Sequence, residues 1–129
     1  MKSFAFGNTP EMNDELLDLV LKGKKTATSW AAKWGREDGG QIGERSFILD
    51  SKGNKRVIIE TVEVIKKPFL QVDESFARAE CEGDLSLDYW RIEHERFFRS
   101  EGTFKPDMEV YCERFKVIEI LPSPGIVMK

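Results

Sequence analysis

The sequence predicts an α+β fold, in which a small and partly open β-barrel has helices packed on its outside. The expected elements run in the order helix, strand, hairpin, helix, helix and long strand, and no βαβ spacing repeats. That order argues against a doubly wound parallel sheet. In the expected last strand the apolar positions change phase by one residue, from Val110 and Cys112 to Phe115 and Val117. Such a slip is typical of a β-bulge, which lets a long strand bend around a small barrel.

The first part of the chain predicts one amphipathic helix and a short polar strand. Asn13 can cap the helix, and Gly23 is a suitable C-terminal stop. The Lys-Thr-Ala-Thr stretch at 25–28 has β character. Residues 29–36 are expected to form a helical turn before the Gly-Gly pair at 39–40 breaks the chain.

The middle of the chain predicts a β-hairpin. Residues 45–50 and 55–67 are strand-like runs on either side of Ser-Lys-Gly-Asn at 51–54, which is a turn sequence. Pro68 ends the second run.

Two helices are expected after the hairpin. The shorter covers residues 72–80 and has Asp73 as its cap, and the longer begins at the cap Ser86 and stops at Gly102. The longer helix has an apolar face at helical spacing, formed by Leu87, Trp90, His94, Phe97 and Phe98. We therefore expect His94 to be a core or near-core histidine.

Composition indicates a single domain over residues 1–129. The chain is 40% hydrophobic and 33% charged, and no apolar run approaches the roughly 20 residues of a membrane span. The N-terminus becomes acidic too early for a signal peptide. Cys81 and Cys112 lack metal-site spacing, which favours reduced thiols in a cytoplasmic protein. The net charge of −3 disfavours strong sequence-independent adhesion to nucleic acid.

The unusual stretch is Gly-Lys-Lys-Thr-Ala-Thr-Ser-Trp at 23–30. Five cations, two tryptophans and no acid occur between residues 22 and 36. These cations suit a helix C-terminus, or they form an anion site with aromatic platforms for bases, and both interpretations stay open. An inward-facing Lys25 could act as a base towards a neighbouring hydroxyl such as that of Thr28. The two converge only if the backbone bends between them, because they lie on opposite faces of an ideal strand.

A second stretch, residues 77–84, ends a helix with three carboxylates, those of Glu80, Glu82 and Asp84. They form a solvated helix end, or one carboxylate turns inward as a general acid/base or as the counter-ion of Lys25. Such a cluster can also hold Mg²⁺. The sequence contains no HExxH, GxxxxGK[ST] or GxGxxG motif, which excludes the corresponding zinc, P-loop and dinucleotide sites.

Three segments together resemble the ASCH domain in its longer bacterial form: residues 23–30, 72–98 and 107–119. The resemblance covers roughly residues 12–120 and implies a PUA-like β-barrel with flanking helices and a cleft between them. By motif it assigns catalysis to Lys25, Thr28 and Glu80. Position along the cleft suggests further substrate-binding residues, namely Lys24, Thr26, Trp30, Arg91, Arg99 and Ser100.

The resemblance implies work on RNA. The first expectation is binding and processing of single-stranded RNA, with Mg²⁺ as the cofactor if the chain is a ribonuclease. The second is a metal-independent amidohydrolase for a modified nucleoside such as N4-acetylcytidine, in which Lys25 deprotonates Thr28 and Glu80 carries the proton to the leaving amine. The remaining expectations are a non-catalytic RNA-binding module and a regulatory domain that binds a small metabolite.

The sequence departs from the family pattern at two places. Ser29 and Trp30 stand where the shorter amidohydrolases have an arginine soon after the threonine. Cys81 stands where the longer subgroup usually has glycine, and a cysteine hinders a left-handed backbone there.

Overall fold

A computed structural model describes residues 1–7, 9–32, 41–83 and 85–122. The elements in chain order are β1 (Lys2–Phe4), α1 (Pro10–Leu21), β2 (Ala27–Ala31), β3 (Arg45–Leu49), β4 (Lys55–Pro68), a 3-10 turn (Phe69–Gln71), α2 (Glu74–Glu80), α3 (Leu87–Glu101) and β5 (Glu109–Ile120). Among the described residues, no helix is long and apolar enough to cross a membrane.

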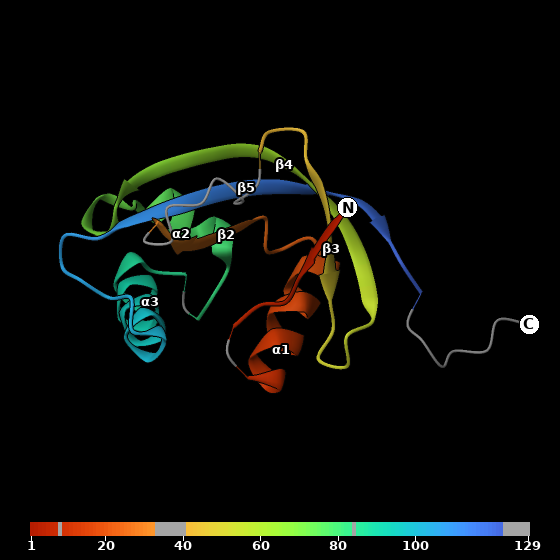
Figure 1. The fold of residues 1–129 in the computed structure, drawn as a ribbon, viewed down its shortest axis with the longest axis horizontal. Coiled ribbons are helices and arrows are strands. Elements are labelled where there is room, and N and C mark those ends of the chain that lie inside the picture. Colours follow the sequence, from red (N-terminus) through yellow and green to blue (C-terminus); the bar gives the residue numbers. More distant parts are fainter. Residues whose placement is uncertain (8, 33–40, 84, 123–129) are drawn as a thin grey trace, which may run out of the picture.

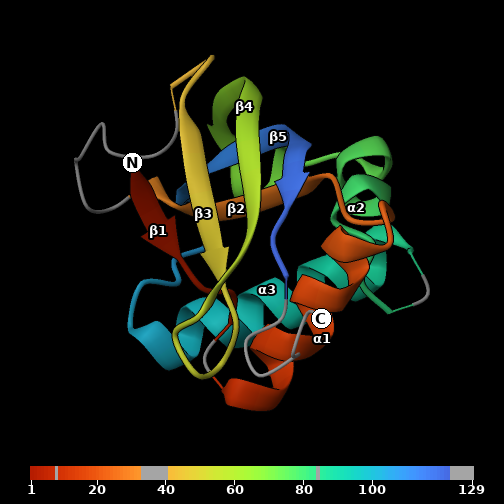
Figure 2. The same cartoon turned by 90° about the vertical axis from the view of Figure 1, so that its right-hand side faces the viewer.

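The five strands form one curled sheet in the order β1-β3-β4-β5-β2. The β1–β3 pair is parallel and the other pairs are antiparallel, and Figure 2 shows β1 beside β3. The long strands β4 and β5 arch over the molecule, and α1 and α3 lie beneath the arch (Figure 1). The architecture is therefore an open half-barrel with three helices, which confirms the predicted α+β class.

Two irregularities bend the long β4–β5 pair. Thr61 and Glu63 of β4 pair with the consecutive residues Phe115 and Arg114, so Val62 is the extra residue. A second shift lies between Ile58 and Ile59. The expected bulge therefore occurs where the apolar phase of β5 changes, but its extra residue belongs to the neighbouring strand.

The core consists of two clusters. One packs α2 and α3 against the β2–β5 end of the sheet and includes Phe69, Trp90 and Phe98. The other packs α1 against β3, β4 and β5 and includes Val20 and Ile59. Each helix is held by its apolar face, as the sequence pattern requires.

Most expected elements are confirmed. The hairpin is formed by β3 and β4, and the side chains of Asp73 and Ser86 accept hydrogen bonds from the N-termini of α2 and α3. Gly102 ends α3 in a left-handed conformation.

Two predictions in the first 31 residues are wrong, and one element was missed. Helix α1 is capped by Thr9, and Asn13 lies inside it, where Oδ1 accepts from the Phe6 amide at 2.6 Å and Nδ2 donates to the Leu49 carbonyl at 3.0 Å. The expected helical turn at 29–36 begins instead as strand β2, and 33–40 lie outside the described residues. Strand β1 had no sequence signal because it has only three residues.

Candidate active site

A cavity of about 700 Å³ lies on the concave side of the sheet. It is lined by residues of both edge strands, β1 and β2, and by residues of α1 and α3. The half-barrel is open between its edge strands, and the helices complete the wall. The curled fold therefore creates one space that polar groups from distant parts of the chain reach.

Lys25 is fixed at this cavity by the segment that follows α1. The amides of Lys24 and Lys25 both donate to the Leu19 carbonyl, at 2.9 and 3.1 Å, and the Thr26 amide donates to the Ala79 carbonyl at 2.8 Å. These bonds tie the segment to the end of α1 and to the end of α2 before β2 begins. As a result Lys24 points to solvent, whereas Lys25 lines the cavity with only 1% of its surface exposed.

The Lys25 ammonium is held by carboxylates. Its Nζ donates to Glu80 Oε1 and to the Glu80 backbone carbonyl, each at 3.2 Å, and lies 3.9 Å from Glu82 Oε2. The Phe6 ring centroid is 5.3 Å away. No hydrogen bond joins Lys25 to Thr28, both of which lie in the described part of the chain. A buried cation of this kind is tolerated because it is paired and hydrogen-bonded.

Glu80 is the centre of a saturated network. Its Oε2 accepts from Ser29 Oγ and Trp90 Nε1, each at 2.7 Å, and lies 3.3 Å from His94 Nε2. Burial by itself would raise the pKa of this carboxyl. The charges of His94 and Lys25 outweigh burial, with help from hydrogen bonds, so the pKa of Glu80 is held far below its ordinary value and the carboxylate stays ionised.

His94 is buried as predicted, and it also belongs to the cavity wall. The ring of His94 stacks on that of Trp90, with 4.1 Å between the ring centroids. Its Nδ1 lies 2.8 Å from the Trp90 carbonyl oxygen, so that Nε2 faces Glu80. Burial would lower the pKa of His94, but the negative charges of Glu80 and Glu82 raise it above the ordinary value. The raised pKa favours the protonated form of His94, which places a second positive charge near Lys25.

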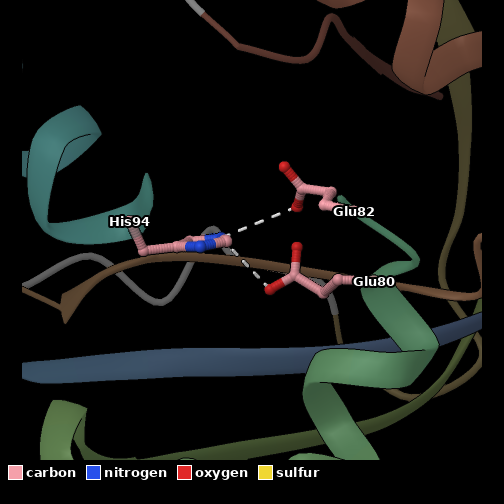
Figure 3. Close-up of side chains that lie close together, drawn as sticks. All are labelled: Glu80, Glu82 and His94. Atoms are coloured by element: carbon pink, nitrogen blue, oxygen red, sulfur yellow. Dashed lines mark ion pairs between the residues drawn. The ribbon is translucent and has the colours of Figure 1, made fainter. Parts of the chain in front are cut away.

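Glu82 completes the cluster from the segment between α2 and α3 (Figure 3). Cys81 is left-handed, with φ 59°, which lets the chain turn sharply so that Glu80 and Glu82 approach the same histidine. Glu82 Oε2 lies 3.9 Å from His94 Nε2. Burial is the main cause of a raised pKa at Glu82, and the charge of Glu80 adds to it.

The cluster of Glu80, Glu82 and His94 has ligand atoms within 4.8 Å of one another, which raises the question of a metal ion. The Lys25 ammonium already lies 3.2 Å and 3.9 Å from the two carboxylates, where a metal ion would bind them. Both oxygens of Glu80 are engaged by protein donors. This donor set therefore fits a fixed ammonium better than Mg²⁺.

A second buried carboxyl, that of Glu113 on β5, lines the same cavity. Its Oε2 accepts from Thr61 Oγ1 at 2.9 Å. Burial is the main cause of its raised pKa, and the nearby charge of Glu44 adds to it, whereas Lys2 acts in the opposite sense. Close by on the same wall, the rings of Trp30 and Tyr111 stack at 5.4 Å between centroids.

The sequence matches the family model of the ASCH domain over residues 2–119. The chain belongs to the ASCH domain family. Solved structures with a similar fold include proteins of Enterococcus faecalis, Lactobacillus crispatus and Zymomonas mobilis. A protein of Enterococcus faecalis is 36% identical, with a TM-score of 0.84 over 93% of this chain and 77% of its own.

The ASCH domain of Lactobacillus crispatus is 32% identical, with a TM-score of 0.81 over 90% of this chain and 78% of its own. The ASCH protein of Zymomonas mobilis shares the fold alone, with 10% identity and a TM-score of 0.59 over 93% of this chain and 70% of its own. No curated protein matches the sequence.

The ASCH fold brings some of the predicted site residues together and leaves others apart. Lys25, Thr28, Trp30 and Glu80 line the cavity. The other five predicted residues do not belong to its described lining: Lys24, Thr26, Arg91, Arg99 and Ser100.

Three of those five have other contacts on the helical side of the ASCH domain. Arg91 donates to the Leu70 carbonyl, and Arg99 pairs with Glu95. Ser100 Oγ donates to the Phe97 carbonyl. Lys24 and Thr26 have exposed side chains.

Sequence reasoning missed several residues that hold Glu80 or line the ASCH cavity. Ser29, Trp90 and His94 contact Glu80, and Glu113 comes from the far end of the chain. The i, i+4 spacing of Trp90 and His94 was visible, but it was interpreted as an apolar face. A buried glutamate in β5 could have been suspected from the phase change, which places Cys112 and Glu113 both inside.

Proposed function

We propose that this ASCH domain binds one nucleoside unit, free or within single-stranded RNA, and hydrolyses an acyl amide on its base. The observation that carries the proposal is the buried Lys25 ammonium, which is 1% exposed and held by Glu80 in the wall of a cavity that Thr28 also lines. A lysine and a threonine hydroxyl in the wall of one cavity can supply the base and the nucleophile of acyl transfer.

The size and charge of the cavity favour a single unit over a bound strand. A volume of about 700 Å³ lies within the ordinary range of small-molecule sites. Among the described residues that line the cavity there are six glutamates, against two lysines and one histidine. Carboxylates repel phosphate, so this wall disfavours the tracking of a phosphate backbone. The Trp30–Tyr111 pair offers an aromatic surface on which one base can stack.

The proposed reaction divides the work among three groups. Lys25 passes a proton to Glu82, whose raised pKa makes it the better acceptor of the two nearby carboxylates. The amine then takes the Thr28 proton as the hydroxyl oxygen attacks the acyl carbon, and it returns a proton to the leaving nitrogen. Water releases the acid from the acyl-threonine ester by the same route.

Glu80, to which the family resemblance gives proton transfer, takes a different role in this scheme. Its carboxylate is 2% exposed and already accepts from Ser29 and Trp90 while pairing with Lys25. We infer that Glu80 keeps Lys25 and His94 in place. Because the neutral Lys25 amine must leave Glu80 to reach Thr28, Glu80 also sets the ground-state position from which Lys25 moves.

The test compares two neighbouring lysines. Wild type, Lys25→Met and Lys24→Met are incubated with N4-acetylcytidine and, separately, with end-labelled single-stranded RNA, each with Mg²⁺ or EDTA. We expect wild type and Lys24→Met to release acetate equally in either buffer. We expect Lys25→Met to lose activity by roughly 100-fold or more, the usual contribution of a positioned base. Circular dichroism verifies that both variants are folded.

Other outcomes identify other functions. Cleavage of RNA by wild type only in Mg²⁺ would overturn the proposal in favour of a metal-dependent ribonuclease. Binding of RNA or nucleoside without any product would make the domain a reader. Thr28→Val tests the nucleophile, and Thr26→Val, at an exposed position of the same motif, is its matched control.

A further inference from the structure

Glu113 is a buried cavity residue to which the proposed chemistry gives no role. The residue is 5% exposed, and its Oε2 is satisfied by Thr61. No hydrogen bond to Oε1 is found among the described residues, although Glu113 lines the cavity. A carboxyl oxygen to which no described residue donates, on a residue that belongs to the wall of a cavity, is available to a ligand that donates a hydrogen bond.

The surroundings of Glu113 indicate what kind of ligand this is. Glu113 pairs with Thr28 across β5 and β2, and Tyr111 pairs with Trp30 in the same ladder. Residues two apart on a strand share a face, and all four line the cavity. A hydroxyl, an open carboxyl oxygen and an aromatic surface therefore lie side by side. An aromatic surface with an adjacent hydrogen-bond acceptor suits a flat heterocycle that carries an N–H group.

When Glu113 is ionised, the charges that face it disfavour an anionic or keto group at this point. Burial is the main cause of the raised pKa of Glu113; the charge of Glu44, next to β3, adds to it, and Lys2 of β1 opposes it. The neighbouring strand β4 contributes the neutral hydroxyl of Thr61. Lys2 is itself paired with Glu44 at 3.4 Å. A phosphate or carbonyl oxygen placed against Glu113 would face acceptor against acceptor.

We propose that Glu113 is a specificity-determining residue that accepts a hydrogen bond from the amino group of a nucleobase stacked on the Trp30–Tyr111 pair. The cavity then takes amino-bearing bases, of the cytosine or adenine type, in preference to their keto counterparts. An acylated amino group keeps one N–H for Glu113, while its acyl carbon lies towards Thr28, the cross-strand partner. This inference rests on the proposed function for its ligand class, but it concerns binding alone.

The experiment is a calorimetric titration of wild type, Glu113→Gln and Glu109→Gln with cytidine and with uridine. The two nucleosides differ in carrying an amino or a keto group at one ring position. We expect wild type to bind cytidine at least about tenfold more tightly than uridine, because uridine leaves the carboxyl oxygen facing a carbonyl. The preference should fall to within about threefold in Glu113→Gln, since an amide can present either an acceptor or a donor.

The control and a second ligand pair make the result decisive. Glu109 is exposed on the same strand, so Glu109→Gln should keep the wild-type preference. Adenosine and inosine repeat the amino-to-keto comparison on a larger ring. The preference should also fall as the pH is lowered through the raised pKa of Glu113, because the acceptor then carries a proton. An unchanged preference in Glu113→Gln, or no preference or no binding in wild type, would overturn the inference.

The two proposals fail differently. Preferential cytidine binding without acetate release would refute the hydrolase and leave the role of Glu113 intact. Acetate release that is independent of Glu113, together with equal binding of cytidine and uridine, would refute the role of Glu113 and leave the hydrolase intact.

Discussion

The two buried glutamates of the cavity, Glu80 and Glu113, differ in how completely they are satisfied. Glu80 is 2% exposed, and hydroxyl, indole, imidazole and ammonium groups surround its two oxygens. Glu113 is 5% exposed and receives one hydroxyl on one oxygen. Nearby cations lower the pKa of Glu80, whereas burial raises the pKa of Glu113. Burial alone therefore does not determine the state of a carboxyl; its partners do.

This difference distinguishes a structural role for Glu80 from a ligand-binding role for Glu113. A carboxylate with every lone pair engaged holds its partners in place, and removing it leaves buried cations without a counter-ion. A carboxyl with an open oxygen contributes little to holding the fold and is available to a ligand. We therefore expect substitutions at Glu80 to act mainly on stability and substitutions at Glu113 to act mainly on binding.

The largest expected effect is that of Glu80→Gln on stability. The change removes the closest ionised partner of the buried Lys25 and His94, and breaking a buried pair typically costs about 3–5 kcal/mol of unfolding free energy. Urea denaturation measures the loss, and an unchanged m-value shows that both proteins unfold from comparable states. Glu82→Gln is the matched control. Glu82 Oε2 lies 3.9 Å from Lys25 Nζ and from His94 Nε2, so this substitution breaks no close pair. Equal costs for the two variants would contradict the assignment of Glu80 as the anchor.

The sequence predicts the elements of this fold better than their ends. Helix caps such as Asp73 and Ser86 act within three residues, so local sequence is sufficient to find them. Asn13 has the same capping chemistry, yet it bonds Phe6 and Leu49, and the contact with Leu49 depends on the tertiary fold. Strand β1 exists because β3 offers a parallel edge, and no local pattern encodes that partner.

The candidate site was predictable where it follows a motif and unpredictable where it depends on the curl of the sheet. Lys25 and Glu80 come from short, unusual stretches, and they meet because the Thr26 amide bonds the Ala79 carbonyl. The arginine candidates were chosen by position along a helix, and helical spacing does not tell which face meets the cavity. Glu113 comes into the site through pairing with β2, a contact between residues 85 positions apart (113 minus 28).

Glu113→Gln is expected to have a smaller effect on stability. As the pH rises, this variant should become more stable relative to wild type, whereas Glu80→Gln is less stable than wild type. An acid with a raised folded-state pKa stabilises the fold fully below its unfolded value of about 4.5, and this contribution is lost as the pH rises through the folded-state value. Gln cannot ionise, so the stability of the variant relative to wild type should increase with pH across that window. His94 and Glu82 also have raised pKa values, but they are present in both proteins and cancel in the difference. Urea midpoints measured from pH 4 to pH 9 test this, and a pH-independent difference would contradict it.

The smallest expected effect comes from the turn that brings Glu80 and Glu82 together. Cys81 lies between them in the left-handed region, with φ 59° and ψ 45°, where its Cβ is strained. Cys81→Gly removes that strain and should stabilise the fold by about 1 kcal/mol, while Cys81→Ala, which keeps the Cβ, should not. Thermal melts of the three proteins measure the change. A gain in Cys81→Ala equal to that in Cys81→Gly would show that the thiol, and not the backbone, is the source of the cost. Glycine keeps the turn geometry accessible, so the Lys25-dependent activity should remain in Cys81→Gly. Loss of that activity would mean that the side chain at position 81 helps to hold the two carboxylates on His94.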